Sequence, residues 1–225
     1  MTMDLNAATT ARFDALWARS VPCSPEGAHR VGGELMRLYA EPHRRFHTLQ
    51  HIDDCLRRFD EVDALIKHPD AVEIALWFHD AIYVPGAPDN EERSVTFFQR
   101  ESSGATPAFA ARVADLIMAT KHLESAQSGD LGFMVDIDLR GFADPWELFM
   151  AKGDELRAEH ADQSDADYYR AQLRFLGRLE NRPFFYCTPY YRSRYEKTAK
   201  QNVRRLLELR AREGHTALQP QPGAM

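Results

Sequence analysis

The segment DAVEIALWFHDAIY, residues 70–83, constrains the fold more than any other part of the chain. Its length suits a helix, and it is apolar on most sides, which predicts a helix at the centre of a bundle. His79 and Asp80 nevertheless lie inside this apolar run. Because a buried carboxylate without a partner is strongly unfavourable, we expect Asp80 to pair with a charged group or to bind a metal ion.

Helical patterns also cover most of the remaining sequence. Apolar residues recur at three- and four-residue steps from Thr48 to Ile66, and further helical stretches span 88–101, 106–122, 144–160 and 195–207. Thr106 and Asp144 each precede a proline, so we expect both to cap helices that begin there.

One segment, FMVDIDLRGF at 133–142, alternates apolar and acidic residues as a strand would. A single short strand cannot satisfy its own backbone groups, and the sequence offers no convincing partner strand. We therefore expect a helix or a bent helical turn at 133–142, and an all-α fold for the chain.

Size and composition predict one domain in a soluble cytoplasmic protein. The chain has 225 residues, 44% of them hydrophobic, which suits a single domain over 1–213, with the motif-bearing part at about 39–141, C-terminal helices at 144–213 and a disordered tail at 214–225. A net charge of −6 argues against a dedicated nucleic-acid surface. Three scattered cysteines without a CxxC pair fit a reducing compartment, and we find neither a signal peptide nor a membrane span.

Several polar side chains point toward the predicted core. At 100° per residue, His79 falls within the apolar arc of its helix and Asp80 lies at the border of that arc. In the preceding helix His51 flanks the apolar face, and His47 lies one turn earlier on the same side. Taken singly, each histidine could be an ordinary hydrogen-bonded core residue, and Asp80 could pair with an arginine.

Asp136 and Asp138 also lie among apolar residues, but they point to nearly opposite sides of a helix. Either could face solvent, so only one is expected to face a given centre. One divalent cation would satisfy the buried imidazoles and carboxylates together. Two of each, with positions left for water, favour Mn²⁺, Fe²⁺, Mg²⁺ or a similar ion over a closed structural zinc site.

Five motifs in order, RFHTLQHI, WFHDAIY, NEERSV, ATKH and DIDLRGF, resemble a family of predicted metal-dependent phosphohydrolases of the HD superfamily. The resemblance runs from about Tyr39 to Leu209 and implies a compact helical bundle around a central metal site. The superfamily pattern H…HD…D corresponds here to ligands of one divalent ion at His47, His79, Asp80 and Asp138. Asp136 is then a candidate for supporting a ligand through a hydrogen bond.

The resemblance also suggests roles for the polar residues around this site. Glu91 is the expected general base or water-orienting group, although first-turn acids such as Glu91 and Glu92 also complement the helix dipole. Lys121 is the expected phosphate contact and His122 a proton donor or a support for a ligand. His51 is expected to contact substrate, with a further ligand and a plain core residue as alternatives.

Two arginines complete the set of candidates. Arg44 and Arg45, just before His47, could hold phosphate, but we expect them to form a solvated helix start.

Together the motifs predict a metal-dependent hydrolase of a phosphate ester or anhydride in a small metabolite, for which superfamily habit favours a nucleotide. An HD-type di-iron oxygenase is the alternative enzyme. Such a two-metal site needs further histidines between the HD pair and the last aspartate, where only His122 lies. A non-catalytic ligand-binding or regulatory protein is the third possibility, and the sequence leaves a homo-oligomer open.

Overall fold

The structure is a computed structural model that describes residues 2–123 and 128–216. All regular elements in these two ranges are helical, which confirms the predicted all-α fold. The chain divides into two compact units, with the boundary between Asp138 and Leu139 at the end of one helix. Each unit is described by itself. None of the described helices combines the length and the apolarity that crossing a bilayer requires.

The described residues of the first unit form seven α-helices and one short 3-10 helix. In chain order these are α1 (Thr2–Ser20), α2 (Pro25–Tyr39), α3 (Leu49–Asp60), η1 (Asp63–Leu65), α4 (Pro69–Phe78), α5 (Asn90–Glu101), α6 (Pro107–Ala119) and α7 (Gly129–Leu139).

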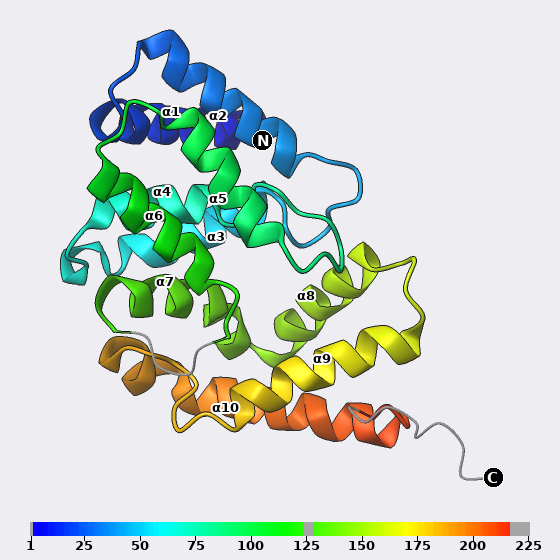
Figure 1. Ribbon diagram of the computed structural model, residues 1–225. Coiled ribbons are helices and arrows are strands. Elements are labelled where there is room, and N and C mark those ends of the chain that lie inside the picture. Colours follow the sequence, from blue (N-terminus) through cyan, green and yellow to red (C-terminus); the bar gives the residue numbers. More distant parts are fainter. Residues whose placement is uncertain (1, 124–127, 217–225) are drawn as a thin grey trace. The chain divides into compact units, whose positions relative to one another are not determined.

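Helix α4 is the centre of this unit, as its apolar sequence predicts. Every residue from Ala71 to Phe78 is buried, and α1, α3, α5 and α6 all pack against α4 (Figure 1). The ring of Phe78 lies 5.5 Å from that of Trp17 and 5.3 Å from that of Phe98. Burying one such side chain contributes roughly 1.5–3 kcal/mol, so this aromatic cluster anchors the end of α4 that leads into the HD pair.

The central helix is shorter than predicted, because it ends at Phe78 and not near Tyr83. The carbonyls of Asp80 and Ala81 accept hydrogen bonds from the guanidinium of Arg44, at 2.7 and 2.9 Å. Arg44 also donates to the carbonyl of His47 at 3.0 Å and is buried. The expectation of a solvated Arg44 is therefore wrong. Hydrogen bonds from its guanidinium connect the loop before α3 to the turn after α4. Arg45, by contrast, is exposed as expected.

The limits of the other predicted helices agree only partly with the structure. The predicted helix from Thr48 to Ile66 is interrupted, since α3 ends at Asp60 and η1 follows. The cap of α6 is confirmed, with Thr106 Oγ1 accepting from the Phe109 amide at 3.3 Å. The ambiguous segment is helical, with α7 passing directly into the 3-10 turn η2 (Arg140–Ala143).

The second unit contains η2, α8 (Trp146–Glu159), α9 (Asp165–Glu180) and α10 (Pro189–Arg212). The predicted cap Asp144 is wrong, because α8 begins one residue later, with Pro145 in the cap position. The Asp144 carboxylate is bound by Arg140 and Lys152. Buried Asn202 on α10 fixes the turn instead, donating to the carbonyls of Phe142 at 2.8 Å and Asp144 at 2.9 Å. Residues 217–225 of the predicted tail lie outside the described residues.

Candidate metal centre

Four side chains meet inside the first unit. His51 comes from α3, His79 and Asp80 from the turn after α4, and Asp138 from α7. The Nε2 atom of His51 lies 3.3 Å from His79 Nε2, 3.5 Å from Asp80 Oδ2 and 3.3 Å from Asp138 Oδ1. His79 Nε2 lies 2.9 Å from Asp80 Oδ2 and 3.7 Å from Asp138 Oδ1. We call these four residues the tetrad.

The spacing of these donor atoms suits a metal ion. Ligands about 2.1 Å from a common ion lie roughly 3.0 Å apart in an octahedral site and roughly 3.4 Å apart in a tetrahedral one. The donor separations that involve the two imidazoles, from 2.9 to 3.7 Å, cover both values. The residues present therefore fit a divalent cation, and the predicted central metal site has a suitable set of donors.

The imidazole of His79 is oriented by the backbone. Its Nδ1 lies 2.9 Å from the carbonyl of Leu76, which can only accept, so Nδ1 carries the proton. Nε2 then points into the tetrad with a free electron pair when the ring is neutral. This arrangement, in which one ring nitrogen is tied to a carbonyl and the other faces the site, is typical of metal-binding histidines.

The tetrad holds two carboxylates in a confined space. Burial alone would raise the pKa of Asp138, but hydrogen bonds from His122, His51 and His79 outweigh it and hold that pKa well below its usual range. Burial likewise opposes protonation of His51, yet Cys55 and Asp138 raise its pKa to about 10. The neighbouring imidazoles therefore favour the charged form of Asp138. A divalent cation would bind here in competition with the protons on these imidazoles.

His122 supports Asp138 from the side away from the other histidines. Its Nε2 donates to Asp138 Oδ2 at 2.9 Å, which leaves Oδ1 facing His51. The backbone of His122 has a φ of 54°, a left-handed conformation that is uncommon outside glycine. Asp136, two residues before Asp138, is fully buried and outside the tetrad.

Lys121, just before His122, lies beside the acidic residues at the start of α5. Its Nζ is paired with Glu92, donates to the carbonyl of Pro88 at 3.0 Å, and lies 3.9 Å from Glu91 Oε2. Glu91 is half-buried, and burial together with the negative charge of Asp80 raises its pKa, although Lys121 opposes this. The structure therefore places the charged groups of Glu91 and Lys121 within 3.9 Å of each other, while His122 contacts the tetrad through Asp138.

His47 lies at the edge of this site. Its ring is 4.1 Å from that of Tyr83 and 6.1 Å from that of His51, between centroids, and it is half-buried. Burial would raise the pKa of Asp80, but the nearby imidazoles, that of His79 before that of His47, lower it. The groups with metal-ligand spacing contain His51 and not His47, among the described residues.

Cys55 is the residue that sequence reasoning missed. It is fully buried on α3, one turn after His51, and its Sγ lies 3.7 Å from His51 Nε2. His51, Cys55 and Asp138 form a second group of donors with metal-ligand spacing. The four-residue step from His51 to Cys55 would have indicated it, but the thiol was counted only as part of the apolar face of its helix.

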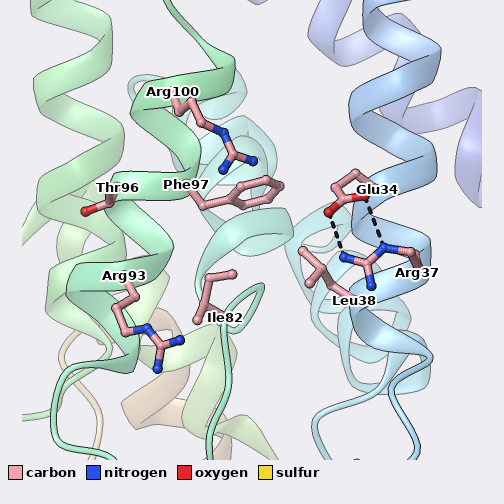
Figure 2. A pocket seen from close by; sticks show the side chains of 8 residues that line it. All are labelled: Glu34, Arg37, Leu38, Ile82, Arg93, Thr96, Phe97 and Arg100. Atoms are coloured by element: carbon pink, nitrogen blue, oxygen red, sulfur yellow. Dashed lines mark hydrogen bonds and ion pairs between the residues drawn. The ribbon is translucent and has the colours of Figure 1, made fainter.

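A separate pocket of about 370 Å³ lies between α2 and α5. Figure 2 shows Arg93 and Arg100 extending from α5 on one side, with Glu34 and Arg37 ion-paired on the α2 side. No tetrad residue contributes to its lining, which comprises Glu34, Arg37, Leu38, Ile82, Arg93, Thr96, Phe97 and Arg100.

In its described residues the chain is all-helical, with groupings of buried His and Cys and partly buried Asp that could hold a metal ion. No protein-family model, curated protein or solved structure matches the chain. The resemblance to the HD superfamily therefore stays a prediction that rests on the five sequence motifs.

Proposed function

We propose that the chain is a metal-dependent hydrolase of a phosphate ester or anhydride in a small metabolite, with a nucleotide as the favoured class. The observation that carries this proposal is the tetrad, in which two imidazole nitrogens and two carboxylates converge at ligand spacing. The HD motifs of the sequence support the same reaction class. The choice of a nucleotide as the substrate class rests only on the substrates that are usual in the HD superfamily.

The proposed ligand set is His51, His79, Asp80 and Asp138. It differs from the sequence expectation in one residue, because His51 takes the place of His47. The reason is distance: His51 Nε2 lies within 3.5 Å of donors on the other three residues. The donor groups with ligand spacing found among the described residues contain His51 and not His47.

A divalent ion held there would lower the pKa of water and offset charge on phosphoryl oxygens. The chain's own residues then have three tasks. Glu91, half-buried and with a raised pKa, accepts a proton from the attacking water. Lys121 contacts a phosphoryl oxygen when it exchanges its partners on α5 for substrate. His122 acts as a positioning residue that fixes the orientation of the Asp138 carboxylate.

The two alternatives predict different metal contents. A di-iron oxygenase needs two separate donor groups, but the two groups found in the described part of the chain both contain His51. One ion is therefore favoured over two. A regulatory protein would bind the ion and a phosphorylated ligand without turnover.

The decisive experiment is a screen of nucleotides and sugar phosphates with metal-free protein to which Mn²⁺ is returned. Phosphate and pyrophosphate are measured separately, and metal content is determined on the same samples. We expect one ion per chain and Mn²⁺-dependent release, both lost in Asp80→Ala and His51→Ala. Two irons with oxygen uptake, or stoichiometric Mn²⁺ with no release from any substrate, would refute the proposed activity.

The ligand assignment has its own matched control. His47→Ala should retain one Mn²⁺ per chain, because His47 lies outside the tetrad, whereas His51→Ala should lose it. The opposite pattern would restore His47 to the ligand set and remove His51.

A further inference from the structure

We propose that His51, Cys55 and Asp138 form a second binding mode, for a thiophilic divalent ion such as Zn²⁺ or Cd²⁺. It shares two residues with the tetrad and so rests on the same proposed ion centre, but it requires no catalytic activity. Cys55 has no role in the proposed hydrolysis, yet its thiol is completely buried beside the site. Thiolate sulfur favours Zn²⁺ and its heavier analogues over Mn²⁺ or Mg²⁺.

The distances match a tetrahedral zinc site. With Zn–N and Zn–O near 2.1 Å and Zn–S near 2.3 Å, tetrahedral angles place nitrogen and sulfur roughly 3.6 Å apart, and nitrogen and oxygen roughly 3.4 Å apart. The structure has 3.7 Å between His51 Nε2 and Cys55 Sγ, and 3.3 Å between His51 Nε2 and Asp138 Oδ1. All three donor atoms lie within 4.8 Å of one another.

The backbone holds these donors in place before an ion arrives. His51 and Cys55 are one turn apart on α3, so their side chains emerge on the same face of the helix. Asp138 is held from the other side by His122 at 2.9 Å. Binding requires that two bonds be broken, the S–H bond of Cys55 and the Nε2–H bond of His51: sulfur and nitrogen keep their electron pairs and donate them to the ion, and the protons go to solvent.

The two modes exclude each other, because both use His51 and Asp138. When a thiophilic ion is bound to Cys55, His51 and Asp138 are no longer free to bind a second ion together with His79 and Asp80. Zn²⁺ and Cd²⁺ should therefore compete with Mn²⁺ and leave the protein inactive in the proposed hydrolysis. Cys55 thereby makes the ion centre sensitive to thiophilic metals.

The test titrates Co²⁺ into the metal-free, full-length protein and records the thiolate-to-cobalt charge-transfer absorption in the near ultraviolet. The remaining cysteines, Cys23 and Cys187, provide the matched control. We expect the absorption in the wild type and in the double variant Cys23→Ser/Cys187→Ser, in which Cys55 is the only thiol. It should be absent in Cys55→Ser and in Cys55→Ala, both compared with the wild type by circular dichroism to verify folding.

Competition experiments measure the same effect as affinities. Zn²⁺ affinity should fall at least about tenfold in Cys55→Ser, since even partners outside the ligand shell contribute tenfold or more, while Mn²⁺ affinity should not change. Asp80→Ala, which abolishes the proposed hydrolysis, should keep the absorption. An absorption that survives in Cys55→Ser, or that is missing from the double variant, would overturn the thiolate mode. Neither result depends on whether any phosphate ester is hydrolysed.

Discussion

The sharpest test of the architecture around the tetrad is the removal of Arg44. Its guanidinium is buried and donates to three backbone carbonyls, those of His47, Asp80 and Ala81, at 3.0, 2.7 and 2.9 Å. Replacing Arg44 by alanine leaves these three acceptors without their donor. We expect this loss to destabilise the first unit and to release the turn that carries His79 and Asp80.

The magnitude follows from the number of acceptors. Leaving one buried polar group unsatisfied costs about 1–3 kcal/mol. Water that enters the space left by the side chain will form hydrogen bonds with some of these carbonyls, so the three costs will not add fully. We expect the free energy of unfolding to fall by roughly 3–5 kcal/mol. For a chain of this size, that corresponds to a melting temperature lower by roughly 6–20 °C.

The assay is urea unfolding of metal-free protein, followed by Mn²⁺ binding to the folded state. Arg45→Ala is the matched control, because Arg45 is the adjacent residue, is exposed, and donates to the carbonyls of Pro42 and Arg44 outside the tetrad. It should cost less than about 0.5 kcal/mol. Arg44→Lys should lie between the wild type and Arg44→Ala, because an ammonium cannot reproduce the guanidinium fork. Equal stability of Arg44→Ala and Arg45→Ala would refute the reasoning.

Three further outcomes are expected. Burial raises the pKa of Glu91, so its carboxylate takes up a proton at a higher pH than usual and can no longer accept one. The kcat–pH profile should fall on its acid side accordingly, and Glu91→Gln should lack that limb and lose about 10²–10⁴-fold in kcat. His122→Asn suits the positive φ but loses the reach to Asp138, so calorimetry should show Mn²⁺ affinity reduced roughly 10–100-fold with an almost unchanged melting temperature. His122→Ala should lower both the Mn²⁺ affinity and the melting temperature. Thr106→Ala removes the cap of α6, and urea unfolding should show a loss of about 1 kcal/mol.

The sequence determined the features that depend on neighbouring residues. The apolar run at 70–83 predicted a central helix, and the packing of α1, α3, α5 and α6 around α4 confirms it, although α4 ends earlier, at Phe78. Thr106 before a proline predicted the start of α6, because a cap needs only the three residues that follow it. The acidic alternation at 133–142 was resolved correctly as helix from hydrogen-bond requirements alone.

Tertiary structure decided the rest, because it depends on residues that are distant in sequence. His47 and His51 lie on the same side of the chain's helical pattern, and only the packing of α3 against α4 brings the imidazole of His51 within 3.3 Å of His79. Arginine is usually a surface residue, but Arg44 is buried, because it donates hydrogen bonds to the carbonyls of Asp80 and Ala81 in the turn after α4. Asp138 on α7 and Cys55 on α3 are far apart in sequence, yet their donor atoms lie within 4.8 Å of each other. Periodicity fixes the face on which a side chain lies, whereas the approach of a second helix fixes which side chain on that face meets a partner.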